Sequence, residues 1–200
     1  MLLNKSSAKL IVGLGNPGLQ YLQTRHNIGF TLIDSFIATH PPLKMIQHAQ
    51  YQLYKYQALG VTFFLLKPLT YMNLSGEILP LIWKKTGTTI ASTLVLCDNL
   101  DLPLAQMRFK LKGGSAGQKG LQNIIHVANT DQFPRLFFGI GRPSHPAQSI
   151  SSYVLSSFTS EEEPTLQRGY AIALTIIQLW VKEDFNKIYE ELALHAKSIS

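Results

Sequence analysis

An apolar strand that ends abruptly in a glycine-rich loop constrains the fold of this chain more than any other feature. Leu10–Val12 is a short apolar run with β-branched residues, which is typical of a buried strand. Residues 13–18 read Gly-Leu-Gly-Asn-Pro-Gly, and three glycines with a proline cannot extend a strand. A polar loop follows, and apolar residues at helical spacing begin near Asn27. Ligands bind at the carboxyl ends of strands in open α/β sheets, so this loop is a candidate functional site.

The same glycines match the Gly-x-Gly-x-x-Gly pattern of dinucleotide-binding proteins, but the surrounding sequence disfavours that function. The dinucleotide pattern requires a helix that opens on the glycines and binds the pyrophosphate. Here Pro17 lies inside the pattern, and about ten residues of polar loop precede the helix. No Asp or Glu occurs from residue 35 to residue 76, where a ribose-binding acid is expected.

Composition is that of a globular protein. Of the 200 residues, 46% are hydrophobic and 15% charged. The N-terminal residues 1–7 are too short and too polar for a signal peptide, and no apolar run approaches the ~20 residues of a membrane span. The single cysteine, Cys97, excludes internal disulfides and fits a reducing cytosol. Cys97 lies in an apolar run, where a buried thiol is usually inert.

Strand signals alternate with helix signals, which predicts an α/β fold. We expect one domain over residues 1–200, with a twisted, mixed, mostly parallel β-sheet flanked by helices. The expected strands are Lys9–Leu14, Tyr51–Leu59, Val61–Leu66, Thr93–Cys97, Met107–Lys112 and Leu136–Ile140. The expected helices are Asn27–Ala38, Ser75–Lys85, Gly120–Val127, Glu161–Val181 and Asp184–Ala196. Leu59-Gly60-Val61 predicts a tight reversal, so the second and third strands should form a hairpin.

Polar side chains follow several of these strands. His26 lies on the loop after the first strand, and Asp98 ends another apolar strand. A His and an Asp that meet at strand ends suggest a general base oriented by a carboxylate. No credible Ser or Cys nucleophile adjoins them, so water is the natural attacker, and an ester is a reasonable target.

Positive charge is concentrated in the part of the chain that carries these motifs. Residues 1–130 hold 12 Lys/Arg and 4 Asp/Glu, a net charge of +8, whereas residues 131–200 hold 6 and 8, a net charge of −2. Arg108, Lys110 and Lys112 alternate, so one face of their strand is cationic. Beside a glycine-rich turn, phosphate contact is the best interpretation of this face, although charge alone fits an ordinary basic protein equally well.

Taken in order, five motifs resemble those of the bacterial peptidyl-tRNA hydrolase family, over about residues 9–187. They are LIVGLGNPG with Tyr21 and TRHN-x-G (residues 10–29), YMNLSG (71–76), DNLDLP (98–103), GGSAGQKGL (113–121) and RLFFGIGRP (135–143). Two departures stand out. The family usually has His-Asn where this chain has Gln118-Lys119, and often a phosphate-clamping arginine where it has Phe137.

The resemblance implies hydrolysis of the ester between a peptide and the 3′-terminal ribose of tRNA. His26 would activate water, Asp98 would support His26, and Asn16 would recognise the acylated end. The implied substrate-binding residues are Tyr21, Tyr71, Met72, Asn73, Arg108, Lys110, Lys112, Gly117 and Lys119. Peptidyl-tRNA is the expected partner, and no cofactor, metal or membrane is implied. We expect a cytoplasmic monomer.

Two alternatives remain. Gly113–Gly117 matches the Gly-x-Ser-x-Gly pattern of serine esterases, with Ser115 followed by Asp131 and His145. However, the strand before Ser115 is cationic instead of buried. Ser115, Asp131 and His145 also lie within only about thirty positions of the sequence. The second alternative is a non-catalytic RNA-binding relative of the same fold.

Overall fold

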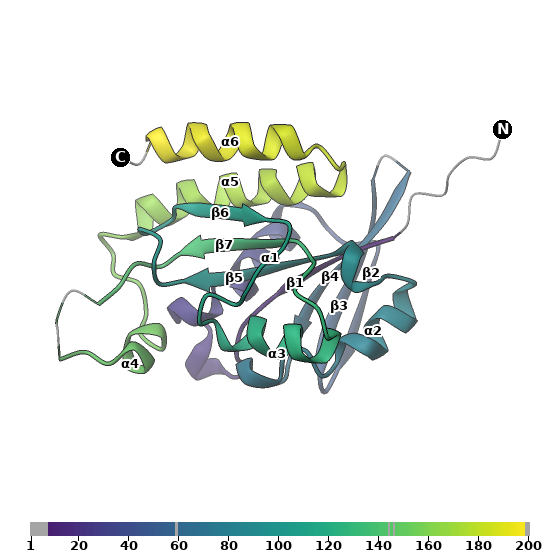
Figure 1. Cartoon of the computed structure of the whole chain (residues 1–200), viewed down its shortest axis with the longest axis horizontal. Coiled ribbons are helices and arrows are strands. Elements are labelled where there is room, and N and C mark those ends of the chain that lie inside the picture. Colours follow the sequence, from purple (N-terminus) through teal and green to yellow (C-terminus); the bar gives the residue numbers. More distant parts are fainter. Residues whose placement is uncertain (1–7, 59, 144, 146, 199–200) are drawn as a thin grey trace.

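The computed structural model describes residues 8–58, 60–143, 145 and 147–198, and these residues build one seven-stranded sheet (Figure 1). The strand order is β2-β3-β4-β1-β5-β7-β6. The strands are β1 (Lys9–Gly13), β2 (Lys44–His48), β3 (Tyr51–Ala58), β4 (Val61–Pro68), β5 (Thr93–Asn99), β6 (Met107–Lys110) and β7 (Arg135–Gly139).

The four inner strands run parallel. β4, β1, β5 and β7 pair in parallel, whereas β2 with β3, β3 with β4 and β6 with β7 pair antiparallel. The predicted mixed α/β sheet is therefore confirmed. The carboxyl ends of β1, β4, β5 and β7 consequently meet at one edge of the sheet, which is where the polar motifs were expected.

Helices cover both faces of the sheet (Figure 1). The α-helices are α1 (Ile28–Thr39), α2 (Leu79–Thr86), α3 (Lys119–Ala128), α4 (Ile150–Val154), α5 (Glu163–Val181) and α6 (Phe185–Ser198). Short 3₁₀ helices are η1 (Leu19–Tyr21), η2 (Arg25–Asn27), η3 (Met72–Leu74) and η4 (Ile90–Ser92). One apolar core joins the sheet to α1, α5 and α6, and a second joins it to α2, α3 and η3. None of the helices in the described part of the chain is long and apolar enough to cross a membrane.

Glycines let the first helix approach the first strand closely enough to fix the site. A Cβ added at Gly29 would lie 2.3 Å from the Leu14 nitrogen and 2.6 Å from the Leu96 oxygen. A Cβ at Gly13 would lie 2.3 Å from the Gly29 oxygen. Because only glycine tolerates these approaches, the start of α1 lies directly on β1 and β5. The turn before α1, η2, is thereby placed beside the end of β5.

Several predicted boundaries were wrong. β2 was not among the expected strands, because nearly all its side chains are exposed and give no hydrophobic signal. The strand expected to reach Lys112 ends at Lys110, since its partner strand begins at Arg135. The helix expected from Ser75 begins at Leu79, after η3 and a turn, and α4 was missed.

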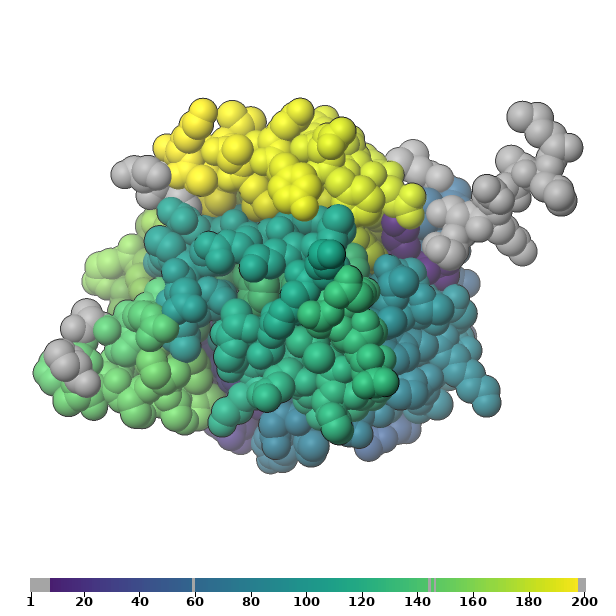
Figure 2. All heavy atoms as spheres, in the orientation of Figure 1, coloured from purple at the N-terminus to yellow at the C-terminus, as the bar shows by residue number. Residues whose placement is uncertain are grey.

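Two expectations involve residues outside the described part of the chain. Leu59 is one of them, but Ala58 pairs with Val61, so the predicted hairpin of β3 and β4 is confirmed. Residues 1–7, in which no signal peptide was expected, also lie outside it. In Figure 2 the α4 segment projects beside the body of the molecule, and purple N-terminal atoms are visible between it and the segment around α3.

Candidate active site

His26 and Asp98 face each other at the carboxyl edge of the sheet. His26 lies in η2, and Asp98 is the penultimate residue of β5. Nδ1 of His26 is 2.9 Å from Oδ1 and 2.9 Å from Oδ2 of Asp98. The Asp98 side chain is 4% exposed and that of His26 13%, so the carboxylate is buried and the ring borders the surface. This is the arrangement of an imidazole oriented by a carboxylate.

Asn16 is hydrogen-bonded to Asn27, the residue after His26, and ties two loops together. Its Oδ1 accepts a hydrogen bond from the Met72 amide at 2.8 Å, which joins the loop after β1 to η3. Asn27 binds the main chain of Asn16 twice, through Oδ1 to the Asn16 nitrogen (2.8 Å) and Nδ2 to the Asn16 oxygen (2.9 Å). Asn16 and Asn27 are both buried. The loop geometry around His26 therefore rests on two buried asparagines.

Arg25 anchors the other side of the turn that carries His26. Its guanidinium donates to Glu162 Oε1 at 2.9 Å and to Oε2 at 2.7 Å. The same group lies 4.6 Å from the ring centroids of both Tyr153 and Phe158. A main-chain hydrogen bond from Arg25 to Ser156 completes the attachment. The segment from α4 to α5 thus holds η2 in place.

Comparisons with known proteins assign the family. A family profile described as "Peptidyl-tRNA hydrolase" matches residues 10–199. The peptidyl-tRNA hydrolase of Geobacillus thermodenitrificans is 41% identical over 196 residues, covering 90% of this chain and 100% of the relative. That of Aquifex aeolicus is 41% identical over 160 residues, covering 80% of this chain and 83% of the relative. The crystal structure of peptidyl-tRNA hydrolase from Acinetobacter baumannii superposes with a TM-score of 0.85 at 30% identity, covering 94% of this chain and 96% of that one.

The chain belongs to the peptidyl-tRNA hydrolase family.

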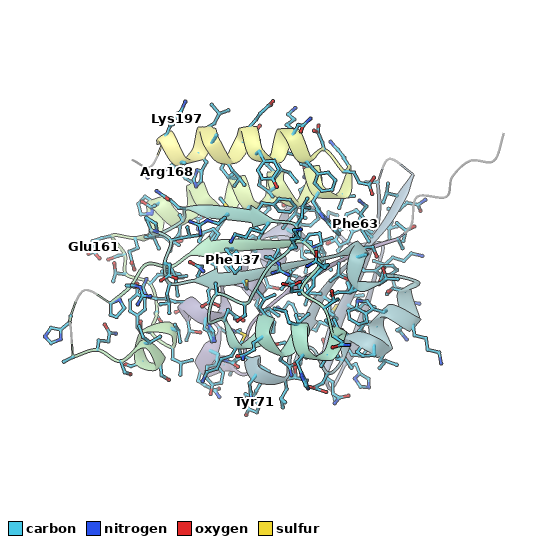
Figure 3. The ribbon with its side chains drawn as sticks, in the orientation of Figure 1. Phe63, Tyr71, Phe137, Glu161, Arg168 and Lys197 are labelled. Carbon is cyan, nitrogen blue, oxygen red and sulfur yellow. The ribbon has the colours of Figure 1, made fainter. Side chains whose placement is uncertain are left out.

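In this chain, the departure at Gln118-Lys119 falls beside the His26–Asp98 pair. Gln118 is buried and its Nε2 donates to Asp98 Oδ1 at 3.0 Å. Lys119, by contrast, is the exposed first residue of α3. Phe137 is buried in the core shared by the sheet, α2 and α3, and Figure 3 shows it within the sheet. Position 137 therefore supplies no cation that could contact a phosphate.

The expected channel residues lie around Met72. Met72 is buried, and Gly120 packs so closely against it that an added Cβ would lie 2.6 Å from its sulfur. Tyr71 and Asn73, on either side of Met72, are exposed, and Tyr71 points outward at the edge of the molecule (Figure 3). Tyr21, in η1, is partly buried. Tyr71 and Asn73 thus flank Met72, whose main-chain amide donates to Asn16.

The cationic residues form a separate surface. Arg108 and Lys110 are exposed on β6, whereas Phe109 between them packs against Phe185 of α6. Alternation therefore turns Arg108 and Lys110 to the face that carries α2 and α3. Lys112 is also exposed, but it lies beyond the strand and does not extend the predicted alternating face. No hydrogen bond or ion pair between described residues joins these cations to His26 or Asp98.

A buried arginine fixes the glycine-rich segment between β6 and α3. Arg135 is fully buried, and its Nη atoms donate to the main-chain oxygens of Gly113, Gly114 and Asp131. Burial lowers the pKa of Arg135, although the nearby Cys97 and Asp131 oppose the shift. Gly117, in the same segment, is exposed with a φ of 80°, a conformation that glycine tolerates best.

The serine-esterase alternative gains no support from this geometry. Ser115, Asp131 and His145 are not linked by any hydrogen bond among the described residues, and His145 instead accepts from the Ala147 amide. Cys97 is fully buried, and burial raises the pKa of its thiol well above the ordinary value. Neither Ser115 nor Cys97 is thus placed as a nucleophile next to His26.

A cavity of about 650 Å³ opens at the opposite end of the inner strands, lined by residues such as Phe36, Tyr56, Phe63 and Gln178. Across residues 8–58, 60–143, 145 and 147–198, no three His, Cys, Asp or Glu side chains are grouped to hold a metal ion.

Sequence analysis assigned no contact to four residues that hold the His26 turn and Asp98. They are Arg25, Asn27, Gln118 and Glu162. The first three lie in motifs that resemble the family, but their partners are not adjacent in sequence, and the Arg25–Glu162 pair spans 137 positions. Glu162 lies in none of these motifs.

Proposed function

We propose that this chain hydrolyses the ester between the peptide and the 3′-terminal ribose of peptidyl-tRNA, with a water molecule activated by His26. Membership in the peptidyl-tRNA hydrolase family supports the reaction and the substrate. The observation that carries the mechanism is the 2.9 Å approach of His26 Nδ1 to both oxygens of a buried Asp98.

The pair fits general-base catalysis. With Nδ1–H donated to Asp98, the lone pair of His26 is on Nε2, the nitrogen that takes a proton from water. The hydroxide character that develops on the water attacks the ester carbonyl carbon, and the bond to the ribose 3′-oxygen breaks. The imidazolium, stabilised by Asp98, then returns its proton to that oxygen. A base of this kind contributes a factor of ~10²–10⁴ to the rate.

Asn16 is suited to bind the acylated end of the substrate. Its Oδ1 is engaged by the Met72 amide, so only Nδ2 is left to donate. Among the described residues, Nδ2 of Asn16 donates no hydrogen bond. Nδ2 donates to the ester carbonyl oxygen or to the adjoining ribose in this proposal.

Exposed side chains around the pair would hold the tRNA. In this proposal Tyr21, Tyr71 and Asn73 line the path of the acceptor end, where aromatic faces stack on unpaired terminal bases. The exposed cations contact phosphates: Arg108, Lys110, Lys112 and Lys119. Contacts to the backbone carry no base identity, which suits an enzyme that acts on many tRNAs.

We further propose that the chain acts as a single-domain monomer in the cytoplasm, which gel filtration and cell fractionation will test.

Replacement of His26 tests the mechanism. His26→Ala should lower the turnover of purified peptidyl-tRNA by roughly 10²-fold or more, while tRNA affinity and the unfolding temperature stay near their original values. His126→Ala, at an exposed position of α3, is the matched control and should retain activity. Equal losses of binding and turnover in His26→Ala would identify a structural histidine. Absence of hydrolysis by the unaltered chain would favour the non-catalytic RNA-binding alternative.

A further inference from the structure

Gln118 makes more contacts than the capping of a helix requires. It is the N-cap residue of α3, and its Oε1 accepts from the Leu121 amide at 2.6 Å. Short side chains such as Ser, Asn and Asp normally perform this function. The longer glutamine also extends its Nε2 to Asp98 Oδ1 at 3.0 Å and to Met72 Sδ at 3.1 Å. The Leu121 amide fixes which end is oxygen, so the end that faces Asp98 is the NH₂ donor.

The hydrogen bond from Gln118 determines how the Asp98 carboxylate is oriented. Both of its oxygens lie 2.9 Å from His26 Nδ1, so His26 alone constrains the plane of the carboxylate weakly. Gln118 contacts Oδ1 only and therefore distinguishes the two oxygens. Asp98 and Gln118 are both buried, so water does not readily supply this contact instead. An amide also keeps its protons at every pH at which the protein is folded.

We propose that Gln118 is a positioning residue that holds Asp98 in the orientation required by His26 and couples this orientation to the start of α3. This inference rests on the proposed role of His26 and Asp98. The other charged groups near the pair are directed elsewhere. Arg25 is paired with Glu162, and Lys119 is exposed at the start of α3.

Two substitutions separate positioning from helix capping. Gln118→Asn keeps an oxygen that caps α3 but is one methylene too short to reach Asp98. Gln118→Glu keeps a capping oxygen and places a second carboxylate against Asp98. Gln118→Asn should unfold within a few degrees of the unaltered protein because the cap survives, whereas Gln118→Glu should unfold at a lower temperature because it buries a second carboxylate beside Asp98. Both should lose roughly 10-fold in kcat, because a base displaced slightly from its working geometry loses rate steeply.

The pH dependence gives a readout that a purely structural residue would not change. In Gln118→Glu, the added negative charge favours the imidazolium form of His26. The acid limb of kcat/KM should therefore move to higher pH by about one unit, whereas Gln118→Asn leaves it in place. Gln122→Glu adds the same charge at an exposed position of α3 and should not move the limb.

Nuclear magnetic resonance of the substrate-free protein separates this inference from the proposed function. The His26 ring signal, assigned by its loss in His26→Ala, should titrate at higher pH in Gln118→Glu and not in Gln122→Glu. Unchanged kcat and an unchanged His26 titration in Gln118→Glu would overturn the positioning role. A shifted titration in a protein whose His26→Ala variant remains fully active would instead overturn the catalytic role of His26.

Discussion

Asn27 joins the loop that follows β1 to the turn that carries His26. It is 1% exposed, and its amide group pairs with both the nitrogen and the oxygen of Asn16. Removing this amide leaves two main-chain groups of Asn16 buried without partners. Unsatisfied groups of this kind cost more than the hydrogen bonds themselves contribute.

We expect Asn27→Ala to lower the free energy of unfolding by about 2–3 kcal/mol, measured by urea denaturation. Turnover should fall as well, because Asn16 and the His26 turn lose their common support. Asn186→Ala, at an exposed position on α6, should leave stability within about 0.5 kcal/mol of the original value. A small effect in Asn27→Ala would mean that the loop holds its shape without the paired amide.

The ion pair between Arg25 and Glu162 makes the same turn sensitive to acid. Burial of Glu162 opposes its ionisation, but hydrogen bonds from Arg25 and the Thr159 amide, with the charge of Arg25, outweigh burial and lower its pKa. A pKa that is lower in the folded chain stabilises the fold above the unfolded value of ~4.3. That stabilisation is lost as the pH falls through the lowered folded value.

Glu162→Gln should therefore lower the free energy of unfolding by about 2 kcal/mol at pH 7, because Arg25 stays buried without its counter-charge. The difference between the two proteins should shrink as the pH falls below the unfolded value of ~4.3 and through the lowered folded pKa of Glu162, where this carboxylate becomes protonated in the original protein. Thermal unfolding at a series of pH values measures both effects. A difference that persists at low pH would show that the charge of Glu162 is not what stabilises the turn.

At the scale of elements, the contact of α1 with β1 and β5 has no room for a side chain. The atoms that a Cβ on Gly29 would meet are main-chain atoms of Leu14 and Leu96, which cannot rotate away. We expect Gly29→Ala to lower the free energy of unfolding by about 3 kcal/mol, as overpacking in a core does. Gly114→Ala is the matched control, since a Cβ there meets nothing within 4 Å and its φ is not positive. Comparable unfolding temperatures for the two variants would contradict a tight contact.

The sequence predicted elements well where burial imposes a pattern and poorly where it does not. β1 and β5 are entirely buried, and their apolar runs predicted both strands. β2 pairs along its whole length with β3 but exposes almost every side chain, so no periodicity marks it. The His26–Asp98 pair was predictable because His26 lies on the loop after β1 and Asp98 lies at the end of β5, and both strands end at the same edge. The contact of Gln118 with Asp98 depends on how α3 returns to that edge, which local spacing does not encode.

For the molecule as a whole, charge is divided unevenly along the chain. The segment with net charge −2 supplies β7, α5 and α6, and the segment with net charge +8 supplies the other strands with α1, α2 and α3. Phe109 of β6 packs on Phe185 and Tyr189 of α6, so Lys110 points to the opposite side. Lys197, at the far end of α6, lies on the outer surface (Figure 3).

Lys110→Ala should reduce the slope of log affinity for tRNA against log salt concentration by about one, because one phosphate contact is lost. Filter binding or fluorescence titration over a range of salt concentrations measures that slope. Lys197→Ala removes an exposed cation from α6 and should leave the slope unchanged. Equal slopes for both variants would place the phosphate contacts away from β6.

The placement of Arg108 and Lys110 on one side of β6 and of Phe109 on the other also affects how fast the protein associates with its substrate. A protein whose strand cations, Arg108 and Lys110, lie on one side of the sheet experiences a torque in the field of a polyanion. It turns its α2 and α3 side toward the tRNA before any atom touches. The fraction of productive encounters should then exceed that of a uniformly charged sphere, and salt should slow association more than it hastens dissociation.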